Sequence, residues 1–492
     1  MSVSQSILVA NWLIEKKFNN KLFLLYKNKY FWLLSSLILL HLIGLFYTTD
    51  ISSGLNDIKT KVPLLVIAIL FFSSKPLIKK ELELILKLFT VSVITSSLYC
   101  FIVYLGYTNK TIIDVRDASV FMSHIRFSLI ITFTIFILLF LIKSKQNIII
   151  GCIGIIWLLF FMYKFQMATG LTILISTTFV LTVAFIIKKR NVIFTSLCTL
   201  IIIVCAYFGY HKIKSELLIY NKNNYLSSNL LLSKTVNNNN YLQDTLFNLA
   251  ENGTLITINI SDIELENEWN KRSKLNFKDN DLNGNNLRFT ILRYMASKGL
   301  TKDSIGLSAL TKNDFLNIES GIPNYKYSLN SGLVLKWREL IWEYTKYKRN
   351  ENPSGHTLTM RLEFWKTALY IINQNPIFGV GTGDIQQAFN KAYDETNSKL
   401  SKEWRLRCHN QYLAITVAFG FVGLILFLIY FLFPITTLSN KLHELYWPFV
   451  LIILFSFITE DTLENQAGLT FFAIFQTLFI WLASSKETET NR

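Results

Sequence analysis

Long runs of apolar residues, separated by short charged segments, dominate both ends of the 492-residue chain. Such runs are typical of membrane-spanning helices, because a helix needs about 20 apolar residues to cross the hydrocarbon core of a bilayer. The pattern predicts ten spans, of which the second is short by this length rule. They cover residues 31–48, 61–74, 87–107, 126–142, 147–163, 170–187, 192–210, 411–433, 447–459 and 468–483. The sequence therefore predicts an all-α, multi-pass membrane protein.

Charged residues beside these runs predict how the chain crosses the membrane, since cytoplasmic loops carry an excess of Lys and Arg. With the N-terminus in the cytoplasm, the basic clusters at 75–80, 143–145 and 188–190 fall on the cytoplasmic side. The acidic groups at 50–57, 114–117 and 460–464 then fall on the outer side. Lys59 and Lys61 are the exception. We expect both termini to be cytoplasmic and the large hydrophilic insertion to be extracytoplasmic.

This layout divides the chain into three segments. Residues 1–210 form an N-terminal bundle of seven spans, residues 211–410 form the hydrophilic loop, and residues 411–492 form a C-terminal bundle of three spans. Within the loop, residues 221–240 are rich in Asn and Ser, a composition typical of flexible segments.

Helical periodicity recurs in the rest of the loop. The predicted helix 285–298 has four residues on one face: Leu287, Ile291, Tyr294 and Met295. The predicted helix 361–373 also has four: Leu362, Trp365, Leu369 and Ile372. Shorter helices are predicted at 312–319 and 334–347. No strand pattern persists, so we expect a mainly α-helical loop.

The formal net charge of +16 raises the question of nucleic-acid binding. Much of the Lys and Arg lies beside the apolar runs, where membrane topology and contact with anionic lipid explain it. No nucleic-acid-binding motif accompanies the charge. The five cysteines have no spacing typical of a metal site or a disulfide.

Two motifs in the loop resemble ligand sites but favour ordinary turns. The run Gly379-Val-Gly-Thr-Gly383 resembles part of a phosphate-binding loop, but a helix and Asn375-Pro376 precede it instead of a strand. Asp279-Asn-Asp281 begins like a calcium loop, but Thr290 stands at the twelfth position, where a bidentate Glu is needed. We interpret the first as a tight connection and the second as a solvated turn.

His409 lies at the predicted outer membrane face, immediately before a span, with Arg405 and Arg407 nearby. A histidine is suited to general-base catalysis near neutral pH, because its reference pKa is about 6.5. An interfacial histidine is also a common hydrogen-bonded anchor, and the pattern alone favours that role.

Three other cations are candidates for binding an anion. Arg361 lies on a predicted helix, and its guanidinium is suited to forked binding of phosphate, although a surface salt bridge is its ordinary role. Arg126 lies with His124 at the outer mouth of a span, where it is either functional or snorkelling to the interface. Lys164 occupies a similar position. These residues indicate an external basic site for an acidic, lipid-anchored substrate.

Several short motifs resemble, in this order, those of the O-antigen ligase/polymerase family. They are Arg361-x-x-x-Trp365, Asn375-Pro376, Gly379-Val-Gly381, His409-Asn410-x-Tyr412-Leu413, Gly420-x-x-Gly423 and Asp461-x-x-Glu464-x-Gln466-x-Gly468. Two further segments are similar to the Bacteroidetes-type branch of the family. They are Leu287-Arg-Phe-Thr-Ile-Leu-Arg-Tyr294 with Lys298-Gly-Leu-Thr-Lys-Asp303, and Asn352-Pro-Ser-Gly-His356.

This resemblance implies a helical membrane glycosyltransferase fold (GT-C-like) in the bacterial inner membrane, with the large loop in the periplasm. It implies an inverting, metal-independent enzyme without cofactors, whose catalytic residues are His409 and Arg361. The implied donor is a glycan on undecaprenyl diphosphate, and the acceptor is a lipid A core or another glycan. The family often has a Ser-Arg-Gly motif where this chain has Met167-Ala-Thr-Gly170. The second diphosphate-binding cation is therefore sought among Arg126, Lys164, Arg405 and Arg407.

Three functions remain open at this point. A ligase joins a finished glycan to its acceptor, and a polymerase joins lipid-linked repeats to one another. Both share these motifs, and the large helical loop favours the ligase. A transporter of the lipid-linked sugar is expected to have internal repeats and broken helices with charges near the middle of the membrane, and the sequence has no clear repeat.

Overall fold

The computed structural model describes residues 3–108, 110, 115–143, 148–189, 207, 210–211, 214, 231–244, 250–328, 332–348, 350–438 and 440–490. The chain divides into two compact units. Unit 1 comprises Met1–Asn191 with Pro353–Arg492, and unit 2 comprises Val192–Asn352. Residues 353–410, which the sequence pattern assigns to the hydrophilic loop, thus belong to the same unit as the apolar helices.

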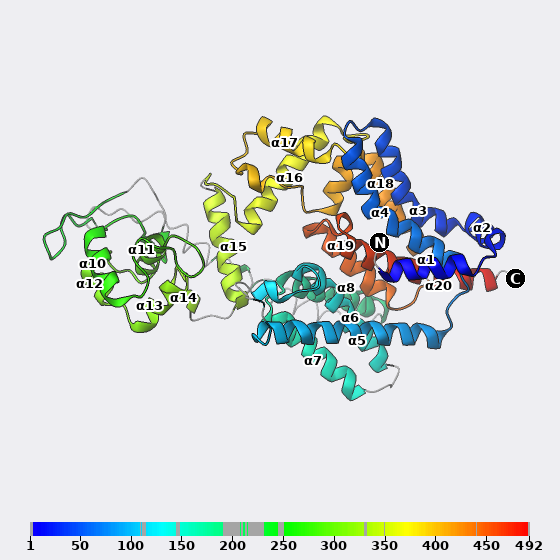
Figure 1. Cartoon of the computed structure of the whole chain (residues 1–492), viewed down its shortest axis with the longest axis horizontal. Helices are drawn as coiled ribbons and strands as arrows, with labels where there is room; N and C mark the ends of the chain where they lie inside the picture. Colours follow the sequence, from blue (N-terminus) through cyan, green and yellow to red (C-terminus); the bar gives the residue numbers. More distant parts are fainter. Residues whose placement is uncertain are drawn as a thin grey trace. The chain divides into compact units, whose positions relative to one another are not determined.

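Unit 1 is built from helices throughout its described part (Figure 1). Its first half contains α1 (Val3–Ile14), α2 (Phe18–Lys27), α3 (Lys29–Gly44), η1 (Leu45–Tyr47), α4 (Ile51–Phe72), α5 (Lys79–Tyr104), η2 (Val115–Ala118), α6 (His124–Lys143), α7 (Ile148–Lys164) and α8 (Ala168–Lys189). Its second half contains α16 (Thr357–Gln374), α17 (Ile385–Glu395), η4 (Lys402–Trp404), α18 (Gln411–Leu438), α19 (Tyr446–Thr459), η5 (Thr462–Glu464) and α20 (Gln466–Thr490).

Six helices within the described residues are long and apolar enough to cross a membrane. They contain Lys29–Tyr47, Lys79–Tyr104, His124–Ile142, Ala168–Lys188, Gln411–Leu438 and Gln466–Ser485. The predicted spans 147–163 and 447–459 are apolar helices of fewer than 18 residues. The predicted span 61–74 begins inside α4, and the predicted span 192–210 lies largely outside the described residues. Six of the ten predicted spans are therefore supported by length and composition, and the total of ten stays a prediction.

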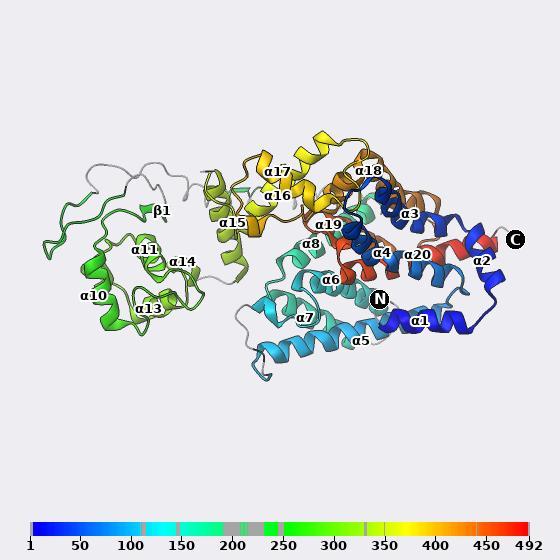
Figure 2. The same cartoon turned by 45° about the horizontal axis from the view of Figure 1, so that its top comes forward.

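The main core of unit 1 joins helices that are far apart in the sequence. α20 packs along α4, and α4 packs along α3 (Figure 2). α18 contacts both α3 and α16. Aromatic rings fill the junction of α6, α19 and α20, where Phe133 lies 5.4 Å from Phe449 and 4.8 Å from Phe475 between ring centroids. The C-terminal helices are thus packed within the N-terminal bundle.

α18 is interrupted at Gly420, where φ is 62° and ψ is −164°. The segment after α16 pairs with this break through its backbone. The N–H groups of residues 380–381 donate to the carbonyl oxygens of 417–418, and those of 421–422 donate to the carbonyl oxygens of 376–377. The break therefore leaves these backbone groups satisfied, as burial requires.

Glycines permit this close approach. Gly379 and Gly381 have φ of 68° and 90°, values that favour glycine. A Cβ on Gly379 would lie 2.4 Å from the Ala418 carbonyl carbon. The glycine run is therefore the tight connection that the sequence predicts, and it packs against another backbone segment.

The buried face of α16 differs in part from the predicted one. Of the four residues predicted to share a face, Ile372 is 5% exposed and Leu369 is 54% exposed, whereas Phe364, Ala368 and Ile371 are each 2% exposed or less. The periodicity is the same, but the face is rotated because α16 packs on α18 and α17. The predicted helix itself is confirmed.

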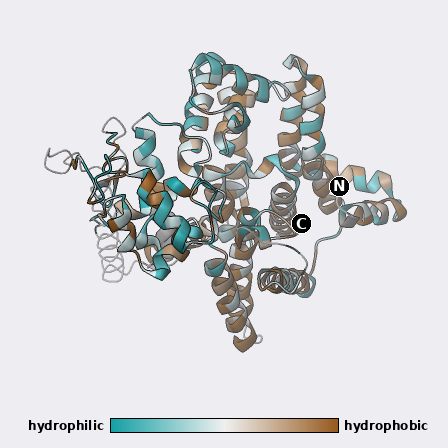
Figure 3. Ribbon diagram, turned by 60° about the vertical axis from the view of Figure 1, so that its left-hand side comes forward, coloured by the Kyte–Doolittle hydropathy of each residue, from teal (hydrophilic) through white to brown (hydrophobic). Residues whose placement is uncertain are grey.

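Unit 2 has its own small core. Its elements are β1 (Ala250–Glu251), β2 (Thr254–Leu255), α10 (Asp262–Arg272), α11 (Leu287–Ser297), α12 (Ser304–Ser308), α13 (Lys312–Glu319), α14 (Tyr325–Ser328) and α15 (Gly332–Lys348). The four residues predicted to share a face of α11 are all fully buried. The helices predicted at 312–319 and 334–347 are confirmed as α13 and α15. Figure 3 shows mixed hydrophilic and hydrophobic colouring in this unit.

The calcium-like segment of unit 2 is a turn in which one residue, Asp281, is buried. Asp281 is 4% exposed, and its Oδ1 accepts the amides of Asn283 and Asn285. The Thr290 hydroxyl donates to Asp281 Oδ2 at 2.8 Å. The prediction of a turn is correct, and its residues are exposed except for Asp281, whose two carboxylate oxygens accept hydrogen bonds from protein groups.

We expect Gly420→Ala to destabilise the protein by about 2–5 kcal/mol. A left-handed φ costs a non-glycine residue about 1–2 kcal/mol, and forced overlap adds about 1–3 kcal/mol. The added Cβ would meet the Ile377 oxygen at 2.1 Å. Thermal unfolding of the purified protein in detergent measures the loss.

Gly106→Ala is the matched control, because Gly106 has φ of 82° and no heavy atom lies within 4 Å of the position that a Cβ would take. It carries the backbone strain without the overlap. Equal losses of stability in the two variants would contradict the packing argument.

Candidate active site

One face of α16 reaches the segment that carries His409. Arg361, Phe364 and Trp365 are spaced i, i+3 and i+4, which places them on the same side of a helix. Trp365 Nε1 donates to the Cys408 carbonyl oxygen at 3.0 Å. The ring centroids of Phe364 and His409 lie 5.7 Å apart. The Arg-x-x-x-Trp motif therefore connects this helix to the residue that precedes His409.

The backbone at His409 is held by its neighbour Asn410. His409 has φ of 45°, a left-handed value that His tolerates better than most residues. Asn410 Oδ1 accepts the Leu413 amide at 3.0 Å and so caps the first turn of α18. Asn410 Nδ2 donates to the Ile458 carbonyl oxygen at 2.9 Å. This pair of contacts joins the start of α18 to the end of α19.

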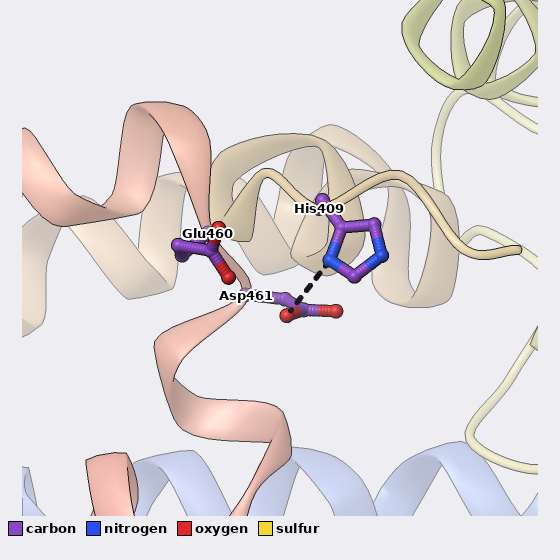
Figure 4. Close-up of side chains that lie close together, drawn as sticks. All are labelled: His409, Glu460 and Asp461. Carbon is purple, nitrogen blue, oxygen red and sulfur yellow. Dashed lines mark ion pairs between the residues drawn. The ribbon is translucent and has the colours of Figure 1, made fainter. Parts of the chain in front are cut away.

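Two consecutive carboxylates at the end of α19 meet the two predicted catalytic residues. Arg361 Nη2 lies 2.5 Å from Glu460 Oε1. His409 Nδ1 lies 3.5 Å from Asp461 Oδ1, an ion-pair distance that is long for a hydrogen bond. Figure 4 shows His409 and Asp461 facing each other, with Glu460 beside them. The turn at residues 460–461, which we call the carboxylate turn, therefore supplies an anion to Arg361 and to His409.

Burial and charge shift the pKa values in this group. The polar contact with Asp461 raises the pKa of His409, and the negative charges of Asp461 and Glu460 add to this against the opposing effect of burial. Burial raises the pKa of Glu460, while the charges of Arg361, His409 and Arg126 lower it. The His409 side chain is 33% exposed and that of Glu460 is 7% exposed. The His409 imidazole is thus partly exposed and lies beside carboxylates that favour its charged form.

A buried ionic network fixes this turn in place. Lys61 Nζ donates to Glu464 Oε2 and to the Leu463 carbonyl oxygen, both at 2.7 Å. Gln411 Nε2 donates to Glu464 Oε1 at 3.1 Å, and Gln411 Oε1 accepts the Leu463 amide at 2.8 Å. The Lys61 ammonium and the Glu464 charge lower the cost of burying each other. Because Gln411 follows His409 by two residues, the network connects α4, the segment that carries His409 and the carboxylate turn.

Arg126 is the candidate second cation that lies within electrostatic reach of this group. Its charge favours the ionised form of Glu460 and so lowers the pKa of that carboxyl. Arg126 Nη1 donates to the Ser123 hydroxyl at 2.9 Å. Its Nε is buried and has no hydrogen-bond partner among the described residues. Arg126 therefore retains donors for an anion.

The other three cations are engaged elsewhere. Arg405 Nη1 lies 2.5 Å from Asp394, and the Lys164 ammonium lies 5.4 Å from the centroid of the Tyr104 ring. Arg407 Nη1 lies 3.2 Å from Asp57. Arg407 lines a small pocket whose other lining residues are mostly apolar. The lining residues are His41, Ile385, Phe389, Arg407, Cys408, Ala414, Ile415, Ala418, Phe419, Asp461 and Glu464. Arg407 thus lies near Asp461 with its charge already paired.

Sequence analysis missed Glu460 as a functional candidate and gave Asp461 no role. The signal for Asp461 was present in the Asp461-x-x-Glu464 motif. Glu460 had no such signal, because its importance depends on Arg361, which lies 99 residues away in the chain. An acidic residue at a helix end is usually solvated, and the sequence alone cannot distinguish this buried one.

The same group has a spacing that suits a cation. Ligand atoms of His409, Glu460 and Asp461 lie within 4.8 Å of one another. One feature opposes metal binding: the Arg361 guanidinium already pairs with Glu460.

Comparison with known proteins gives one family. A sequence model for the family described as O-antigen ligase matches residues 118–428, more than half of the chain. The matched range contains Arg126, Arg361 and His409 and ends before Glu460 and Asp461. No curated protein is similar enough to the chain to count as a match.

We expect Asp461→Asn to lower the pKa of His409, because the substitution removes the negative charge that favours the imidazolium. Diethyl pyrocarbonate modifies neutral imidazole, so its reaction with His409, followed by mass spectrometry across a pH series, measures this titration. The midpoint should move to lower pH. Asp394→Asn is the control, since Asp394 pairs with Arg405. A midpoint that is unchanged by Asp461→Asn would show that Asp461 does not set the titration.

Proposed function

This chain belongs to the O-antigen ligase family, and on that premise we propose that it moves a glycan from undecaprenyl diphosphate to a lipid A core or a similar acceptor. Activity of the ligase or polymerase type follows from the family. The proposed location is the periplasmic face of the bacterial inner membrane, with both termini in the cytoplasm. This location agrees with the charge pattern beside the apolar helices.

The observation that carries the proposal is the adjacency of a base and a cation. His409 and Arg361 each bind one of two consecutive carboxylates, although the two residues come from different elements. Glycosyl transfer from a diphosphate needs both groups. The base accepts the proton of the acceptor hydroxyl, and the cation stabilises the charge that develops on the leaving group.

The proposed reaction is a single displacement. The acceptor oxygen attacks the anomeric carbon of the donor while its proton passes to His409. The bond between the anomeric carbon and the phosphate oxygen breaks, and its electron pair stays on undecaprenyl diphosphate. Arg361 neutralises that charge. Attack opposite the leaving group inverts the anomeric configuration, and His409 then releases its proton to water.

We assign Arg126 as the second diphosphate-binding residue. Its electrostatic influence on Glu460 supports this choice, as does the partnerless Nε. The ion pairs of Arg405 and Arg407 weaken their candidacy, and Lys164 lies over an aromatic ring. A diphosphate held between two guanidinium groups replaces the charge neutralisation that a divalent metal supplies in other transferases.

We expect glycan transfer by the purified protein to persist in excess EDTA. The cations of Arg361 and Arg126 supply the positive charge, so removing divalent metal should change the rate by less than about twofold. The assay uses detergent-solubilised protein with lipid-linked glycan extracted from the native bacterium. Loss of activity that added Mg²⁺ or Zn²⁺ restores would instead assign a metal to His409, Glu460 and Asp461.

We expect His409→Ala and Arg361→Ala each to reduce transfer by about 10²-fold or more, the range for loss of general-base or charge-stabilising groups. A deletion strain is complemented with each variant, and its surface glycan and undecaprenyl-linked pool are compared on gels. Lys391→Ala is the control, because Lys391 is exposed and pairs with Glu395. Wild-type glycan in the His409→Ala strain would remove that residue from the mechanism.

The same gels separate the ligase from the polymerase. Long chains that accumulate on undecaprenyl diphosphate in the deletion strain indicate a ligase. Acceptor lipid that carries a single repeat indicates a polymerase.

A further inference from the structure

Glu460 is a buried carboxylate at the centre of the charged group. It ends α19, and its backbone amide donates to the Ser456 carbonyl oxygen at 2.9 Å. The whole residue is 5% exposed. An ionised carboxylate at such a position is costly unless a cation accompanies it. Arg361 is that cation, at 2.5 Å.

The contact between the two residues is one-sided. Arg361 Nη2 donates to Glu460 Oε1, and within the described part of the chain the guanidinium makes no other hydrogen bond. A guanidinium carries five N–H donors in a fixed plane, so Nε and Nη1 stay available for another anion. The Arg361 side chain is 21% exposed and that of Glu460 is 7% exposed. Glu460 therefore contacts Arg361 from the more buried side.

Glu460 is also next to the residue that contacts the base. Its neighbour Asp461 pairs with His409, so the spacing between the two carboxylates is fixed by one peptide unit. The network of Lys61, Glu464 and Gln411 holds the same turn. A cation attached to Glu460 and a base attached to Asp461 are thus held at a set distance.

We propose that Glu460 is a positioning residue, which fixes Arg361 beside His409 so that the remaining guanidinium donors meet the diphosphate of the donor. This inference rests on the proposed function. Glu460 does not touch the substrate, and it acts through Arg361. In the empty site it balances the charge of that arginine, and in the loaded site it keeps one edge of the guanidinium in place.

The first test measures Arg361 itself, without reference to activity. Phenylglyoxal modifies arginine, and mass spectrometry reports the rate at Arg361 in the full-length protein. Glu460→Gln should raise this rate at least threefold, because the ion pair that protects the guanidinium is lost. Glu460→Asp should lie between wild type and Glu460→Gln. Glu395→Gln, which removes an exposed partner of Lys391, is the control and should leave the rate unchanged.

The second test is a double-mutant cycle on transfer of the native lipid-linked glycan. Glu460→Gln should lower kcat by about 10- to 100-fold, since small misplacement of a catalytic group has effects of that size. Adding Glu460→Gln to Arg361→Ala should have no further effect, because a residue that acts through Arg361 has nothing left to position. Glu460→Asp should recover part of kcat.

The outcomes distinguish the two proposals. In one outcome, Glu460→Gln speeds the labelling of Arg361, but the wild-type protein has no transferase activity. This result would support the placement of Arg361 by Glu460 and refute the proposed function. An active wild type with unchanged labelling and full activity in Glu460→Gln would overturn the positioning role. Additive losses in the double mutant would also overturn it, since they would show that Glu460 acts independently of Arg361.

Discussion

The ion pair between Lys61 and Glu464 is the constraint on which the geometry of the active site depends. Lys61 comes from α4, and its ammonium also holds the Leu463 carbonyl oxygen. Removing one partner of a buried pair typically costs about 3–5 kcal/mol, because the other charge is left without compensation. Gln411 joins the pair to the start of α18. The network thus sets the carboxylate turn against the segment that carries His409.

The pair also explains an irregularity in the sequence. Lys59 and Lys61 lie where an apolar stretch begins, so the pattern predicts a short span at 61–74, whereas α4 begins at Ile51. Lys61 is 1% exposed, and a charge inside a helix is tolerated there because Glu464 neutralises it. A hydropathy pattern places such a lysine at the boundary of a membrane span. It cannot reveal that Glu464, 403 residues later in the chain, is the partner of Lys61.

Local patterns predicted the elements well and their tertiary partners poorly. The helix at 285–298 is set by its own periodicity, and its predicted face is buried. The buried face of α16 was predicted only in part, since that face is set by packing against α17 and α18. Arg361 and His409 were predicted through motifs that resemble a family. The contact of Glu460 could not be predicted, because only folding brings this side chain to Arg361.

The long sequence separations within the site have a consequence for biosynthesis. Arg361, His409 and their two carboxylates come from segments that are translated far apart, and Asp461 is the last of them to be made. A nascent chain that has not yet reached Glu460 and Asp461 contains Arg361 and His409 without their anions. Translation must therefore pass Asp461 before the four side chains can come together. Fragments released earlier contain the Arg361 and His409 motifs but lack both ion pairs.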